Sequence, residues 1–231
     1  PNPEHKPIIN HKDGDKLNNC VTNLEWCTYR ENTQHAWDTG LIKSKSTEPI
    51  EELTENEILE KDEYFWINGY YDNEGLPVEN IDEGRVMLTG AVFGIMSGTV
   101  SDELLDGFIK TADKYLYRPE NGGYSLNTRF EEEEAYAHKL GRMFGFAYGT
   151  KENGAVFCHM AVMYAYALLK RGKRKEALKV VTSILGQSMD FEHSHIYPGV
   201  PEYFDLNGRG MYPYLTGAAS WMLLLLYRLS E

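Results

Sequence analysis

Hydrophobic residues recur at helical spacing through most of the chain after residue 100. Ser101 and two acidic residues precede apolar side chains that follow one face of a predicted helix. Two further helices are predicted over 155–171 and 173–189, with Gly172 as the stop signal between them. A fourth, over 215–229, is apolar nearly all round, so we expect it to be buried among other helices. The larger part of the chain is therefore predicted to be mainly α.

The first 43 residues follow a different pattern. A tight turn at Asp13-Gly14-Asp15 precedes a short strand with apolar residues, and 29–37 is predicted to be a short helix. A ββα arrangement of this kind would bring His11 and Asn32 together around a cavity. In such a cavity a neutral histidine can deprotonate water, and amide or carboxylate oxygens can hold one hard divalent ion.

Between these two patterns, residues 44–63 are polar and acidic, and we interpret them as a linker or seam. The 231 residues include 23 Lys and Arg against 35 Asp and Glu, a net charge of −12. Residues 1–43 are almost neutral, so nearly all of this charge belongs to the rest of the chain. A negative field repels phosphate backbones, so the chain as a whole is predicted to be a poor nucleic-acid binder.

Cysteine usage and the missing leader pattern both favour a cytoplasmic protein. Cys20, Cys27 and Cys158 form no CxxC pair, which suits a reducing compartment. The polar opening of the chain lacks the apolar region of a signal peptide. The apolar run over 214–226 is too short to span a bilayer. We expect no membrane contact.

Two features of the helical part suggest an anion site. His159 stands in the first turns of a strongly apolar helix, where a lone histidine is usually a satisfied core residue. Thr216 is a natural N-cap for the last helix. Its hydroxyl, the amides of Gly217 and Ala218 and the helix dipole would together hold an anion. The alternative, which the residues alone leave open, is that Thr216 caps a core helix and the small residues permit close packing.

Aromatic and polar residues interleave over 66–72 and 196–203. Exposed rings beside carboxylates and amides suit sugar rings, which offer apolar faces and hydroxyl edges. Core packing explains single cases equally well.

The first piece closely resembles the HNH endonucleases of phage and mobile introns. The resemblance is carried by an Asn-His-Lys-Asp-Gly turn, an Asn-Leu-Glu-Trp strand and a Glu-Asn-x-x-His-Ala helix. It implies that His11 is the general base and that Asn23 orients it. It also implies that Asn10 and Asn32 ligate Mg²⁺ or a similar divalent ion, and that His35 touches the scissile phosphate of DNA.

Two departures from the nuclease pattern bear on activity. The first ligand position is often Asp or His in this family, whereas Asn10 is neutral and would bind Mg²⁺ less tightly. The helix and strand that usually precede the motif are not in the sequence, so we expect a truncated module over 1–43. The alternative is a ββα remnant whose asparagines only cap turns.

The remainder resembles the cellobiose and chitobiose phosphorylases, inverting glycoside phosphorylases of glycoside hydrolase family 94. The stretches that carry it, in the family's order from about 64 to 229, are WINGYYDNEG, MLTGAVFGIMSG, ADKYLY with NGGYSLNT, GRMFGFAYGTKENGAVFCHM, and IYPGVPEYF through GRGMYPYLTGAASW. The resemblance implies part of an (α/α)₆ toroid. His159 matches the family's phosphate-contacting His, and Thr216 with Gly217 match its phosphate-binding Thr-Gly.

The resemblance also implies the reaction. A β-linked disaccharide or oligosaccharide is cleaved by inorganic phosphate, which attacks the anomeric carbon while an Asp protonates the leaving oxygen. The family's catalytic Asp and a phosphate-binding Arg lie upstream of the matched stretch, and neither Asp72 nor Asp82 lies in the right motif. We therefore nominate no general acid. The family tends to form homodimers.

The leading interpretation is a partial phosphorylase domain, 64–231, which retains the phosphate residues and is fused to an HNH remnant. A mobile intron or intein that interrupted a phosphorylase gene would produce such a junction, with its seam at 44–63. A second hypothesis is a metal-dependent DNA-nicking enzyme with a passenger domain. A third is a fragment that binds carbohydrate without catalysis, or one that does not fold. The sugar and the linkage stay open.

Overall fold

The computed structural model divides the chain into two compact units, Pro1–Ile50 and Glu51–Glu231. It describes residues 2–39, 57–72, 75–130, 143, 145–197, 199–214 and 216–231. Each unit is described by itself below.

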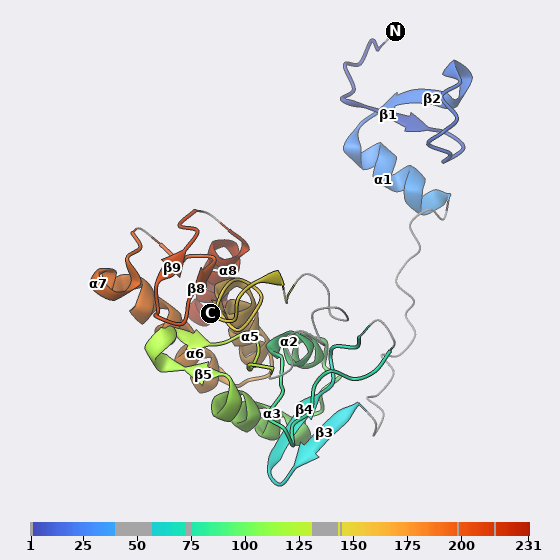
Figure 1. Cartoon of the computed structure of the whole chain (residues 1–231). Helices are drawn as coiled ribbons and strands as arrows, with labels where there is room; N and C mark the ends of the chain where they lie inside the picture. Colours follow the sequence, from blue (N-terminus) through green and yellow to red (C-terminus); the bar gives the residue numbers. More distant parts are fainter. Residues whose placement is uncertain are drawn as a thin grey trace. The chain divides into compact units, whose positions relative to one another are not determined.

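The smaller unit has its strands and helix in the order ββα. Strand β1 (Ile8–His11) pairs antiparallel with β2 (Leu24–Cys27), and a short 3-10 turn at Val21–Asn23 leads into β2. Helix α1 (Tyr29–Asp38) follows β2 and lies beside the hairpin (Figure 1). This is the local order that the sequence pattern predicts.

A capping box fixes the start of α1. The Thr28 hydroxyl accepts from the Glu31 amide at 3.2 Å, and the Glu31 carboxylate accepts from the Thr28 amide at 2.7 Å. Lys6 also donates to Glu31, at 2.9 Å. These donors, the Thr28 amide first, lower the pKa of Glu31 to about 2. The capping box and the Lys6 contact therefore tie the helix to the chain before β1.

The larger unit begins with an antiparallel hairpin, β3 (Ile58–Lys61) and β4 (Tyr64–Ile67). The expected linker over 44–63 is therefore wrong for its last residues, because Ile58–Lys61 pair with β4. The hairpin packs on residues much further along the chain: Trp66 stacks on Phe108, and the Thr111 hydroxyl donates to the Phe65 carbonyl at 2.9 Å. Residues 44–56 lie outside the described part of the chain.

Most of the remaining elements are helices joined by two-residue strands. The helices are α2 (Leu88–Ser97), α3 (Asp102–Tyr115), α5 (Cys158–Lys170), α6 (Arg174–Met189), α7 (Phe191–Ser194) and α8 (Gly217–Ser230). The strands are β5 (Tyr117–Arg118), β6 (Gly123–Tyr124), β7 (Val156–Phe157), β8 (Tyr203–Phe204) and β9 (Gly210–Met211), and Pro119–Asn121 is a 3-10 turn. The mainly helical character matches the prediction and is compatible with a partial helical toroid.

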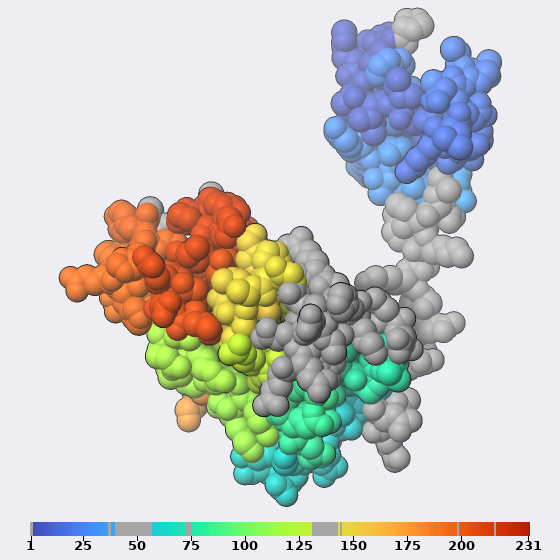
Figure 2. Space-filling model, viewed as in Figure 1, coloured from blue at the N-terminus to red at the C-terminus, as the bar shows by residue number. Residues whose placement is uncertain are grey.

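Helix α5 lies at the centre of the core. It packs against α2, α6 and α8, while α3 covers β4 (Figure 1). Ala161, Ala165 and Ala167 are fully buried, and such small side chains let neighbouring helices approach closely. The C-terminal residues, orange to red in Figure 2, gather on one side of this unit, next to the yellow residues that precede α5.

Helix α8 departs from the expectation that it is buried on all sides. Ala218, Met222 and Leu225 are buried, a single stripe that faces α5. Leu223, by contrast, is 71% exposed and Tyr227 61% exposed. The helix is apolar nearly all round, as its sequence indicates, but within the described residues only one of its faces is covered. No helix in the described part of the chain has the length and apolarity needed to cross a membrane.

The other predicted helices agree closely with the structure. Ser101 stands at the N-cap of α3, and Gly172, at φ 76°, follows α5 as the predicted stop. Helix α5 begins three residues later than predicted, because Val156–Phe157 pair with β8 before the helix starts. A two-residue strand leaves no periodic signal, so sequence pattern alone extends the helix through it.

A buried carboxylate joins the hairpin to α2. Glu79 accepts from the Trp66 indole N–H at 2.9 Å, from the Gly69 amide and from the Met87 amide at 2.8 Å, and it is 3% exposed. Burial raises the pKa of Glu79 to about 7, against the opposing effect of these donors. Gly69 is required here, because a Cβ on it would lie 2.5 Å from the Gly90 Cα of α2.

The raised pKa of Glu79 predicts a pH-dependent stability. The folded chain holds this proton more tightly than the unfolded chain. The contribution is therefore fully present below about pH 4.5 and is lost as the pH rises through 7, by at most about 1.4 kcal/mol per pH unit. Urea unfolding at several pH values should show that Glu79→Gln removes this slope. The same substitution at exposed Glu120 is the control, and an unchanged slope in Glu79→Gln would contradict the assignment.

Candidate functional site

The structure brings His159, Thr216 and Gly217 together where α5 and α8 meet. His159 lies in the first turn of α5, and Gly217 is the first residue of α8. A Cβ built on Gly217 would lie 2.5 Å from Cε1 and 2.7 Å from Nδ1 of His159, so the imidazole rests directly on the glycine backbone. Trp221, one turn along α8, has its ring centroid 6.4 Å from that of His159.

Thr216 caps α8 with its side chain. Its hydroxyl oxygen accepts from the Ala218 amide at 3.2 Å. This corrects one expectation, since the Ala218 amide is not free to bind a ligand. The Thr216 hydroxyl hydrogen stays available as a donor, and the Gly217 amide belongs to the first turn, where backbone N–H groups have no partner within the helix.

The imidazole of His159 has an open hydrogen-bonding position. Its Nε2 is buried and has no partner among the described residues. Burial lowers the pKa of His159, so the ring is neutral near pH 7. A buried ring nitrogen without a partner costs about 1–3 kcal/mol. A ligand that accepts from or donates to this nitrogen offsets that cost.

Two elements outside the helices fix the start of α5. Strand β7 pairs with β8, and the Cys158 amide donates to the Glu202 carbonyl at 2.9 Å. The fully buried Asn127 accepts from the Gly154 amide at 2.8 Å and donates to Asn153 at 3.3 Å. Sequence reasoning did not single out Asn127 or Asn153. Both lie in stretches that carry the phosphorylase resemblance, NGGYSLNT and GRMFGFAYGTKENGAVFCHM, and this resemblance is the sequence feature that could have identified them.

A second missed feature lies on the same loops. Lys151 and Tyr212 both adopt positive φ, 47° and 59°, which is uncommon for side-chain-bearing residues. The Lys151 ammonium lies 4.5 Å from the centre of the Tyr212 ring. A positive φ costs energy at a residue with a side chain, so two such residues in contact indicate that the surrounding loops hold this backbone conformation in place.

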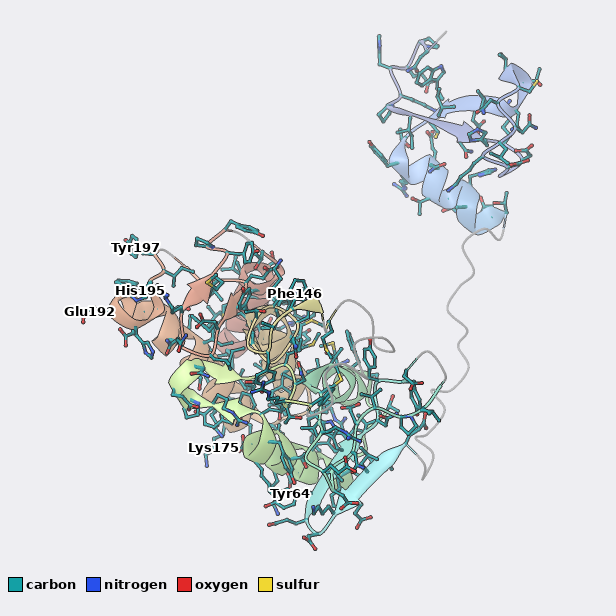
Figure 3. The ribbon with its side chains drawn as sticks, viewed as in Figure 1. Tyr64, Phe146, Lys175, Glu192, His195 and Tyr197 are labelled. Carbon is teal, nitrogen blue, oxygen red and sulfur yellow. The ribbon has the colours of Figure 1, made fainter. Side chains whose placement is uncertain are left out.

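The two aromatic segments differ in exposure. Trp66 is fully buried and stacks on Phe108 at 5.5 Å, so it belongs to the core and is no sugar platform. Tyr197 is 73% exposed and makes an edge contact with Phe191 at the α7 end of the unit, near His195 and Glu192 (Figure 3). Tyr71 of the first segment is also exposed, at 46%, so each segment offers one exposed ring among its described residues.

In the smaller unit, predicted residues from β1 and α1 line one cleft of about 550 Å³. Asn10 and His11 come from β1, and Asn32 and His35 from α1, where a spacing of three places them on one face. The ββα order therefore brings His11 and Asn32 to a common cavity.

The hydrogen bonds around this cleft differ in one respect from the nuclease pattern. Asn23 does not contact His11, because its side chain bonds the backbone and carboxylate of Asp13 and the carbonyl of Asn18. Instead, Asn19 Oδ1 lies 3.1 Å from His11 Nε2. The expectation that Asn23 orients His11 is not met by direct contact.

The cleft offers amide oxygen atoms, which are of the type that binds a hard cation such as Mg²⁺. The side-chain N–H of Asn10 donates to the Glu25 carboxylate at 3.0 Å. The side-chain oxygen, Oδ1, takes no part in this hydrogen bond and is the atom of Asn10 that can bind a cation. Amide oxygens are ligands that Mg²⁺ accepts, but they carry no charge. Among the described residues, no group of three or more His, Cys, Asp or Glu could hold a metal. Neutral amide ligands such as Asn10 are expected to bind Mg²⁺ less tightly than carboxylates.

Comparison with known families assigns each unit. The family model for the glycosyl hydrolase 94 superfamily catalytic domain matches residues 24–229, and that for HNH endonucleases matches residues 2–34. The chain therefore belongs to the glycosyl hydrolase 94 superfamily, with an HNH endonuclease match at its start.

Individual relatives agree with both assignments. The chain is 28% identical over 179 residues to a 3-O-beta-D-glucopyranosyl-beta-D-glucuronide phosphorylase of Paenibacillus borealis, covering 68% of this chain and 22% of that protein. A solabiose phosphorylase of the same organism is 27% identical, covering 68% and 21%. Forty residues are 58% identical to an uncharacterized HNH endonuclease of Acanthamoeba polyphaga mimivirus, covering 17% and 10%. The chain thus spans about a fifth of the phosphorylases it matches.

The contact between His159 and Gly217 predicts a selective effect of Gly217→Ala. The new methyl group displaces the imidazole, so phosphate binding measured by calorimetry should fall at least about tenfold. Folding should persist, because Ala favours a helix by about 1 kcal/mol over Gly.

Gly186→Ala is the matched control. Gly186 lies within α6 and has no atom within 4 Å of a built Cβ, so the substitution should leave phosphate binding unchanged. Equal phosphate affinity in Gly217→Ala and the unaltered chain would contradict a phosphate site at His159 and Gly217.

Proposed function

We propose that the larger unit is the phosphate-holding part of an inverting glycoside phosphorylase. Membership of the glycosyl hydrolase 94 superfamily and similarity to several phosphorylases support this proposal. The single observation that carries it is the buried Nε2 of His159, which has no partner among the described residues and lies beside Thr216 and Gly217. The substrates proposed are a β-linked disaccharide or oligosaccharide and inorganic phosphate.

In this proposal the three residues hold the nucleophile. The helix start and the Thr216 hydroxyl donate to phosphate oxygens, and the positive end of the α8 dipole faces the anion. One phosphate oxygen bonds to the anomeric carbon as the glycosidic C–O bond breaks, and the leaving oxygen takes a proton. Positioning the phosphate turns an encounter of two solutes into a reaction between neighbours.

The general acid is assigned to none of this chain's described residues. Asp72 accepts from the Leu76 amide and so stabilises a turn. Asp82 is an exposed carboxylate 3.7 Å from the Lys61 ammonium. Neither is buried, and burial is what keeps a carboxyl protonated near neutral pH.

Anion binding at His159 should strengthen as the pH falls. Burial lowers the pKa of the ring, whereas a bound anion favours the imidazolium, so binding takes up a proton. Sulfate is the probe, because it keeps its charge across this range. Calorimetry should show about tenfold tighter sulfate binding at pH 5.5 than at pH 7.5.

His159→Phe keeps a planar ring and removes both nitrogens, so it should abolish the pH dependence. His193→Phe, at an exposed position on α7, is the control. Sulfate binding that is independent of pH, or unaffected by His159→Phe, would refute the phosphate site.

A second candidate function rests on the cleft of the smaller unit. We propose that Asn10, His11, Asn32 and His35 form a metal-dependent DNA-nicking site, with His11 as general base and Asn10 and Asn32 as ligands. Mg²⁺ would supply charge to the phosphate at this site. The unaltered chain should nick supercoiled plasmid in Mg²⁺, and His11→Ala should lower the rate about 10²-fold or more. Equal nicking by both chains would exclude this site.

The two units together support a proposal about the gene. We propose that the phosphorylase part was joined to the end of a mobile nuclease, with the seam within residues 44–56. Because Ile58–Lys61 pair with the next strand of the phosphorylase part, the proposal takes the seam to lie before them and not across the whole of 44–63.

A further inference from the structure

The contact between His11 and Asn19 determines which imidazole nitrogen carries the hydrogen. Asn19 Oδ1 lies 3.1 Å from His11 Nε2. An amide oxygen only accepts, so Nε2 must donate. Asn19 Nδ2 points to the Leu17 carbonyl at 3.5 Å, and this acceptor places the NH₂ end of the amide away from His11. The two contacts of the Asn19 amide, through Oδ1 and through Nδ2, therefore agree with the same orientation of the side chain.

Asn23, the residue expected to orient His11, has another task. Its Oδ1 accepts from the Asp13 amide at 3.1 Å, and its Nδ2 donates to Asp13 at 2.8 Å and to the Asn18 carbonyl at 2.9 Å. All these contacts lie in the turn between β1 and β2. Its side chain thus holds the loop that carries Asn19, and Asn19 reaches the histidine.

We propose that Asn19 is the positioning residue of His11 in the nicking site. Its amide oxygen holds His11 in the Nε2–H tautomer and leaves the Nδ1 lone pair to take a proton. In that step a water proton moves to Nδ1, so that water becomes hydroxide and the ring becomes imidazolium. Nε2–H stays bonded to Asn19 throughout. This proposal rests on the nuclease function proposed above.

His35 supplies an internal reference in the same cleft. Its Nε2 lies 3.0 Å from the Lys12 carbonyl oxygen, which has no hydrogen to give. His35 is therefore also an Nε2–H tautomer, fixed by the backbone and not by a side chain. A change at Asn19 should leave its tautomer unchanged.

The test is ¹⁵N NMR of the full chain, labelled at histidine, without metal or DNA, at about pH 9, well above the ordinary histidine pKa of about 6.5. His11→Ala identifies the His11 signals. In the unaltered chain, the two ring nitrogens of His11 should show the separated shifts of an Nε2–H tautomer. In Asn19→Leu those shifts should move towards each other, while the His35 shifts stay constant.

Two further variants separate the hydrogen bond from general loosening of the loop. Asn19→Asp keeps an accepting oxygen and should preserve the Nε2–H tautomer. Asn18→Leu alters a neighbouring asparagine that bonds Asp13, and it should leave the His11 tautomer unchanged. An Nδ1–H tautomer in the unaltered chain, or no change in Asn19→Leu, would overturn the proposal.

Plasmid nicking completes the test. Positioning partners of this kind change activity about 10- to 100-fold, so Asn19→Leu should nick that much more slowly and Asn19→Asp should recover part of the rate. If the tautomer responds to Asn19 but no chain nicks DNA, the positioning role stands and the nuclease function fails. If the unaltered chain nicks DNA and Asn19→Leu nicks equally fast, the positioning role fails.

Discussion

The packing of α5 among three other helices is the constraint on which the larger unit depends. Its buried alanines allow α2, α6 and α8 to approach it closely, and the largest part of the core lies along its length. His159 is in the first turn of this helix. Its position therefore follows from the packing of the whole unit, and so does its distance from α8.

The same packing explains why the candidate site is specific to these residues. Gly217 lets the imidazole rest on the first turn of α8, and Thr216 holds the end of that helix in place. The Nε2 atom that results is buried and has no hydrogen-bond partner in the part of the chain that the structure describes. Natural proteins rarely leave such an atom in the interior without a purpose, because it costs stability. In the function proposed above, a bound anion supplies the missing partner.

Much of the fold follows from the sequence, and the exceptions have physical causes. Helical periodicity and the stop at Gly172 predict α3, α5 and α6 to within a few residues. The polar, acidic composition around Ile58–Lys61 predicts a linker, whereas pairing with Tyr64–Ile67 makes this segment a strand. The apolar composition of the last helix predicts that it is buried on all sides. Composition alone does not show which elements cover each face, and among the described residues only the face towards α5 is covered.

The candidate sites were predictable to different degrees. His159, Thr216 and Gly217 stood out both from the helix start and from the family resemblance, and the structure places them together. The role of Asn19 is not predictable from sequence, because Asn18, Asn19, Asn23 and Asn32 all follow His11 closely and only the loop geometry shows which one reaches it. Asn127 was missed for a similar reason, since its contacts with Gly154 and Asn153 join distant segments.

The most direct test of the central claim is a titration of the full chain with inorganic phosphate, followed by the NMR signals of the His159 ring. The account predicts a saturable shift of the His159 Nε2 and Cε1–H resonances, with the other histidine signals unchanged. A His159 ring that does not respond to phosphate at concentrations where other histidines do would contradict the assignment of this site.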